Sequence, residues 1–250
     1  MAHSIDISES GGVRYLHFGS EWVQGAMRIA RPFSLELAYT REMLLALLLA
    51  AAPLRHGLLV GLGAASQLKF LHRHFPEARF TVIEINPDVP NVARQFFRLP
   101  ASPRIDIVIA DAAAWLTQNA PQARFDLILL DGFNAAGRTG ALSGAAFYAG
   151  CRAALTETGV FSCNLLAGNR GFRANLRRIR HAFAGRSLHF ASGDNGNVVA
   201  LGVAGEYHAL PLTTLRERAL ALKSATGLDL RPALTRLQLT VALPGGCLNL

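Results

Sequence analysis

Short apolar runs rich in β-branched residues alternate with segments of helical periodicity between residues 57 and 203. Five of these runs are predicted as strands, at 57–61, 79–85, 105–111, 125–131 and 159–165. Each is followed by a segment long enough to form a crossover helix. Alternation of this kind is typical of a parallel sheet with helices on both faces, connected by right-handed crossovers.

Two more strands are predicted after a helix at 169–183. They span 187–192 and 197–203, and Gly193-Asp194-Asn195-Gly196 joins them. Glycine, Asn and Asp tolerate positive φ, so this join favours a hairpin. The fold class we expect is therefore α/β, a Rossmann-like sheet that ends in an antiparallel hairpin, as in class I methyltransferases.

The chain divides into three predicted parts. Residues 1–33 form a small β-rich unit with strands at 4–8, 13–18 and 22–29, and residues 34–205 form the Rossmann-like domain, which begins with a helix at 34–51. Residues 206–250 contain helices at 212–226 and 229–238 and end in a loose tail of ten residues.

Composition limits the class of protein. The longest apolar stretch, 43–53, is shorter than the roughly 20 residues that span a bilayer, and the N-terminus lacks the pattern of a secretory signal. We therefore expect a cytoplasmic enzyme without membrane contact. The three cysteines form no Cys-x-x-Cys pair, so the sequence suggests neither a disulfide framework nor a metal site.

A net charge of +8 raises the question of an anionic partner. The densest basic cluster lies on the predicted helix at 169–183, where five arginines are more simply explained as a solvated face. The Asn/Asp-Pro-Pro-Tyr/Phe motif of amino-group methyltransferases of nucleic acids does not follow the fourth strand. Nucleic acid is therefore disfavoured as a partner.

Three carboxylates end predicted strands that we expect to be adjacent, at the sheet edge where open α/β folds bind ligands. Glu84 comes about 20 residues after Gly61 and Gly63, a spacing that suits a ribose held beside a glycine turn. Asp111 precedes a helix, so it is also a candidate N-cap. Asp131 precedes a Gly-rich segment that favours a flexible loop, which makes it the better catalytic candidate.

Several segments resemble spermidine synthases, the polyamine aminopropyltransferases, in order and spacing. They are Leu59-Val60-Gly61-Leu62-Gly63, the run from Val82 to Val89, Ser102-Pro103-Arg104 with the strand to Asp111, the strand from Phe125 to Asp131, and Ala146-Phe147-Tyr148. Upstream, Val23-Gln24 is similar to the family's Asp-Gly-x-x-Gln hairpin. The segment from Tyr39 to Met43 is similar to the family's Tyr-His-Glu-Met helix, although it is one residue longer here. The resemblance covers residues 13–203.

The resemblance implies a nucleoside site, an amine site and a donor, which is decarboxylated S-adenosylmethionine. Its implied nucleoside residues are Gln24 and Glu84 on the ribose, Asp111 at the adenine amino group with Ala112 beside it, and Gly61 and Gly63 beneath the nucleoside. The implied amine-site residues are Asp131 as the catalytic acid or base, and Tyr39 and Asn134 at the border of the acceptor. No metal is implied, and a homodimer is an option that residues 1–51 could build.

Two positions depart from that pattern. Ala64 stands where the family has an Asp that is expected to bind the amine end of the donor, and Asn134 replaces a second loop acid. An acid there would attract decarboxylated S-adenosylmethionine and repel the carboxylate of ordinary S-adenosylmethionine. Three hypotheses remain: an aminopropyltransferase with an altered small-molecule amine acceptor, a methyltransferase of a small molecule on the same scaffold, and a non-catalytic nucleoside-binding relative.

Overall fold

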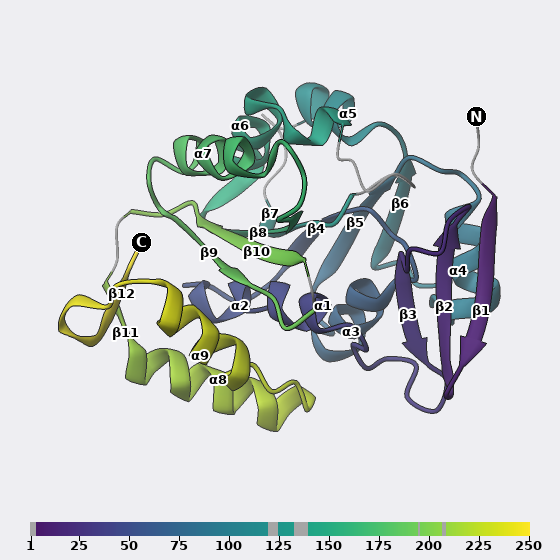
Figure 1. The fold of residues 1–250 in the computed structure, drawn as a ribbon, viewed down its shortest axis with the longest axis horizontal. Coiled ribbons are helices and arrows are strands. Elements are labelled where there is room, and N and C mark those ends of the chain that lie inside the picture. Colours follow the sequence, from purple (N-terminus) through teal and green to yellow (C-terminus); the bar gives the residue numbers. More distant parts are fainter. Residues whose placement is uncertain (1–3, 120–124, 133–139, 195, 207–208) are drawn as a thin grey trace.

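A seven-stranded sheet lies at the centre of the fold (Figure 1), in a computed structural model that describes residues 4–119, 125–132, 140–194, 196–206 and 209–250. The strands follow the order β6-β5-β4-β7-β8-β10-β9. They span β4 His56–Val60, β5 Arg79–Glu84, β6 Ile105–Ile109, β7 Phe125–Leu130, β8 Leu155–Leu166, β9 Ser187–Ala191 and β10 Asn197–Val203. Strands β4 to β8 pair in parallel, whereas β10 pairs antiparallel with both β8 and β9. The expected fold class is thereby confirmed.

Helices cover both faces of this sheet (Figure 1). One face packs against α5 Ala112–Asn119, α6 Ala145–Ala154 and α7 Phe172–Ala182. The other packs against α1 Ala38–Met43, α2 Ala46–Leu49, α3 Ser66–His74, α8 Leu212–Thr226 and α9 Arg231–Thr240, and α4 Val89–Phe97 contributes to the same core. Near-continuous apolar strands such as β7 are what a sheet buried on both faces requires.

A separate three-stranded sheet precedes the central one. Its antiparallel strands are β1 Ile5–Ser10, β2 Val13–Phe18 and β3 Gly25–Arg28. Leu16 and Met27 of this sheet pack with Ala64 and Phe97 in a small apolar cluster. The β-rich sheet therefore lies against the glycine turn and the end of α4, while the division of the chain into three domains stays a prediction.

The helix expected at 34–51 is wrong in its extent, because the segment forms two short helices. Residues before Ala38 are not helical, and Leu37 has extended dihedrals. Leu44 and Leu45 are fully buried and donate to carbonyls three residues back, which tightens the helix into a turn between α1 and α2. Residues of both helices lie in the main core, and the homodimer stays a prediction.

The loose tail expected at the C-terminus is also wrong. After the short 3-10 helix Pro244–Gly246, β12 Cys247–Asn249 pairs with β11 Ala209–Pro211. Leu248 and Leu250 are buried in the main core, so alternate apolar side chains hold the C-terminal strand against it. Among the described residues, no helix is both long enough and apolar enough to cross a membrane.

Candidate active site

The glycine turn after β4 is shaped by its contact with the residue that follows β7. Gly61 has φ +93°, and a Cβ there would lie 2.4 Å from the carbonyl oxygen of Asp131. Gly63 has φ +50°, and its missing Cβ would lie 3.2 Å from the Gln24 carbonyl. Only glycine combines this backbone with such close approaches, so the turn brings β3, β4 and β7 together at one edge of the sheet.

The three carboxylates lie at that edge, although not on three adjacent strands as expected. Glu84 ends β5 and Asp111 follows β6, which are neighbours. Asp131 follows β7, and β4 with its glycine turn lies between β5 and β7. The glycine turn therefore separates Glu84 from Asp131.

Glu84 is buried and holds this turn by hydrogen bonds. Its Oε2 accepts the Leu62 N–H at 2.9 Å, and its Oε1 accepts the Asn86 N–H at 2.9 Å. Burial raises the pKa of Glu84, and the backbone N–H donors oppose that rise by stabilising the charge. The N–H groups of Ile85 and Gly63 also act on the Glu84 carboxylate, so the two hydroxyls of a ribose would share its lone pairs with these backbone donors.

Asp131 sits between two side-chain donors. Asn164 of β8 donates from Nδ2 to Oδ1 of Asp131 at 3.0 Å, and the hydroxyl of Tyr39 from α1 donates a second hydrogen bond. Burial raises the pKa of Asp131, whereas these two donors lower it. The pKa of Tyr39 is raised well above its usual value by burial and then by the Asp131 charge, so its hydroxyl keeps its proton.

A small cavity of about 40 Å³ lies where these elements meet. The residues around it come from β3, the glycine turn, and the starts of α1 and α3. Five residues expected at the site are among them: Gln24, Tyr39, Gly61, Gly63 and Asp131. The cavity therefore joins the implied ribose side to the implied amine side.

Asp111 and Ala112 do not line that cavity. Asp111 is exposed, and its Oδ1 accepts the N–H groups of Ala113 and Ala114 at 2.8 and 3.0 Å, so it is the N-cap of α5. Ala112 is buried at the first position of that helix. Asn134 lies outside the described residues.

Ala64 packs against the N-terminal sheet. Its side chain is 3% exposed, and a Cβ on Gly25 would lie 2.6 Å from the Ala64 Cβ. An acidic side chain at 64 would have to displace β3, so the small pair of residues 25 and 64 explains the departure from the spermidine synthase pattern.

Sequence reasoning missed Asn164 and Asp194. Asn164 is 3% exposed in the buried second half of β8, and a buried amide needs a hydrogen-bond partner, so an Asn beside apolar neighbours was a signal for a polar contact. Asp194 contacts Tyr39 from the β9–β10 hairpin, where its Oδ2 accepts the Tyr39 N–H at 2.9 Å. Nothing in its local pattern separates it from an ordinary turn residue. Within the described parts of the chain, no group of three or more His, Cys, Asp or Glu side chains is placed to hold a metal.

Comparisons with known proteins identify the family to which the chain is similar. The family model for the spermine/spermidine synthase domain matches residues 36–167. Polyamine aminopropyltransferases of Neisseria meningitidis serogroup A and Chromobacterium violaceum are 33% and 34% identical, over 94% of this chain and 89% and 90% of theirs.

Solved structures share the fold. A probable spermidine synthase from Corynebacterium glutamicum is similar with a TM-score of 0.70 at 19% identity, covering 90% of this chain and 85% of that one. Human methyltransferase-like protein 13, solved in complex with SAH, also gives a TM-score of 0.70, at 24% identity, over 77% of this chain and 93% of its own. The scaffold is therefore common to aminopropyl-transfer and methyl-transfer proteins.

Proposed function

Because the chain belongs to the spermine/spermidine synthase family, as the relatives matched over nearly its whole length show, we propose that it moves an aminopropyl group from decarboxylated S-adenosylmethionine to a small amine. It is a transferase of the polyamine aminopropyltransferase type. The observation that carries the proposed reaction is the half-buried Asp131 carboxylate, held by Tyr39 and Asn164 at the edge of the cavity.

The reaction needs a neutral amine. With an amine pKa near 10, only about one molecule in a thousand is unprotonated at pH 7, which costs roughly 4 kcal/mol. Asp131 accepts the proton from the acceptor nitrogen, and burial favours this by raising the pKa of its carboxyl. The nitrogen lone pair then forms the N–C bond while the C–S⁺ bond breaks, and methylthioadenosine leaves as a neutral thioether.

The nucleoside half of the donor is proposed to lie along the glycine turn. Glu84 would accept the ribose hydroxyls, and Gln24 would contact the same sugar from the opposite side of the turn, across Gly63. The free Oδ2 of Asp111 is available to the adenine amino group, because the helix cap uses only Oδ1. These roles agree with the residues implied by the sequence.

Ordinary S-adenosylmethionine remains a second candidate donor because of one observation. With Ala64, the glycine turn lacks the acidic side chain that would repel a donor carboxylate. The packing of Ala64 against Gly25 leaves no space for an acidic side chain at position 64. On this alternative the chain would methylate a small acceptor and release S-adenosylhomocysteine.

The test is a product analysis with the purified chain. Decarboxylated S-adenosylmethionine is incubated with 1,4-diaminobutane, and methylthioadenosine is measured by mass spectrometry. We expect amine-dependent product that falls about 100- to 10,000-fold in Asp131→Asn, the usual range for a lost general base. The matched control is Glu217→Gln, which removes one exposed charge from α8 and should leave the rate unchanged. Product formation that survives in Asp131→Asn would refute the assigned role.

A further inference from the structure

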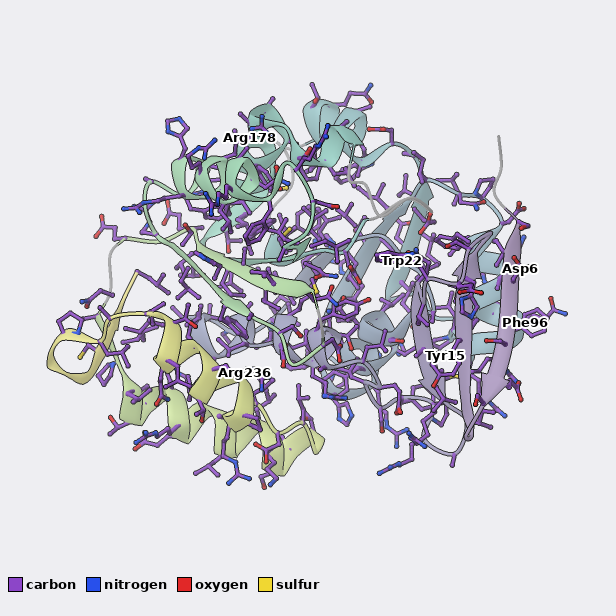
Figure 2. All side chains as sticks on the ribbon, in the orientation of Figure 1. Asp6, Tyr15, Trp22, Phe96, Arg178 and Arg236 are labelled. Carbon is purple, nitrogen blue, oxygen red and sulfur yellow. The ribbon has the colours of Figure 1, made fainter. Side chains whose placement is uncertain are left out.

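Asp194 belongs to a hairpin turn that is fastened to the first helix of the Rossmann-like domain. Its neighbour Gly193 donates its N–H to both oxygens of Glu42, at 3.1 and 3.3 Å. Glu42 is 4% exposed at its side chain and is also paired with Arg236, which comes from α9 (Figure 2). The turn is therefore held in place by a partly buried ion pair.

The two acids of this region differ in how their charges are balanced. The charge of Glu42 is neutralised by the Arg236 guanidinium. Asp194 accepts only the Tyr39 N–H through Oδ2, and within the described residues it has no cationic partner. Its Oδ1 is left to bind something else. A half-exposed carboxylate with one free oxygen attracts a cation.

The position of Asp194 relates it to the cavity. Leu37, Tyr39 and Thr40 line the cavity from the start of α1, and this is the helix end that Asp194 contacts. Tyr39 thus links the two carboxylates, with Asp194 at its backbone N–H and Asp131 at its hydroxyl.

The largest separation that these contacts allow between the two carboxylates is within the reach of a short diamine. A tyrosine hydroxyl lies about 6.5 Å from its own backbone nitrogen, so with one hydrogen bond at each end the two carboxylates are at most about 12 Å apart. In 1,4-diaminobutane the nitrogens are about 6 Å apart, and with a hydrogen bond of about 2.8 Å at each end it also reaches about 12 Å.

We propose that Asp194 is a specificity residue that binds the distal ammonium of a diamine acceptor while Asp131 engages the nitrogen that reacts. The proposal deepens the aminopropyl-transfer function and rests on it. It gives the acceptor site a second carboxylate from a different element, although position 134 carries a neutral amide.

The substitution Asp194→Asn separates this role from helix capping, because the Asn carbonyl can still accept the Tyr39 N–H. The acceptors are 1,4-diaminobutane and n-butylamine, which has the same carbon chain and one ammonium. We expect Asp194→Asn to lower kcat/KM for the diamine about 10- to 100-fold, through KM, since a hydrogen bond to a charged group is lost. The value for n-butylamine should not change. Glu217→Gln controls for net charge.

An equal fall for both amines would mean that Asp194 only supports Tyr39, and no change for either would mean that it binds neither; both results overturn the proposal. Calorimetric titration of each amine into the protein gives a readout that does not need turnover. If no methylthioadenosine forms, the aminopropyl-transfer function fails. In that case, the role of Asp194 in binding the distal ammonium is still supported if Asp194→Asn weakens binding of 1,4-diaminobutane and not of n-butylamine. It is refuted if the unsubstituted protein binds both amines equally well.

Discussion

Lys69 supplies a quantitative test of the packing around the glycine turn. It lies on α3, directly after that turn, with 1% of its surface exposed. Its Nζ donates to the carbonyl of Phe97, the last residue of α4, at 2.6 Å. Burial lowers the pKa of Lys69 to about 7 from an ordinary value of 10.5. We predict that this single group gives the stability of the protein a characteristic pH dependence.

The direction follows from proton counting. Between pH 7 and 10.5 the unfolded chain binds a proton on Lys69 that the folded chain has released, so stability rises with pH across this window. Integrated from about pH 6.5 to about pH 9.5, the contribution of Lys69 becomes more favourable by about 3 kcal/mol. The substitution Lys69→Met removes the titrating group and keeps an unbranched side chain of similar length.

Urea unfolding of both proteins at several pH values between these limits gives the comparison. Other groups titrate in both proteins, so they cancel in the difference between the two free energies of unfolding. We expect that difference to shift in favour of the unsubstituted protein by about 3 kcal/mol as pH rises. A difference that stays constant within about 0.5 kcal/mol would contradict this prediction, because it would mean that Lys69 is not desolvated.

Three further predictions concern the site itself. Gly61→Ala should destabilise the protein by about 2 to 4 kcal/mol in chemical denaturation, because the new Cβ meets the Asp131 carbonyl; Gly185, at φ +86° against +93°, has open space around a Cβ, so Gly185→Ala should cost clearly less. Asn164→Leu removes a donor that lowers the pKa of Asp131, so the acid limb of the kcat/KM profile should move to higher pH, and an unshifted limb would contradict this. Glu84→Gln leaves one backbone N–H facing the NH₂ of the new amide, so it should cost about 1 to 3 kcal/mol in stability. It should also weaken the binding of the donor, measured by calorimetry, and unchanged affinity would contradict a role of Glu84 in the ribose site.

The regular part of the fold was predictable because its signals are local. β10 and α8 begin and end where the pattern places them, since apolar runs and turn residues mark their boundaries. The segment after residue 34 was not predictable in detail. Residues 43–51 are apolar throughout, so they show no amphipathic periodicity that could mark a break in the helix. The i→i+3 turn at Leu44 and Leu45 is imposed by burial against the sheet.

The candidate site divides in the same way. Gly61 and Glu84 carry spacing signals that the sequence displays, and the structure brings them to one turn. Asp194 is brought to Tyr39 from 155 positions away by the antiparallel hairpin, and no local pattern contains that contact. The cytoplasmic location, the homodimer and the absence of a nucleic-acid partner stay predictions.

The central claim is aminopropyl transfer that depends on Asp131, and a competition between donors tests it most directly. Equal concentrations of decarboxylated and ordinary S-adenosylmethionine are mixed with 1,4-diaminobutane and the purified chain, and both nucleoside products are measured by mass spectrometry. We expect methylthioadenosine in large excess, formed only when the diamine is present. S-adenosylhomocysteine as the main product would contradict it and assign the scaffold to methyl transfer.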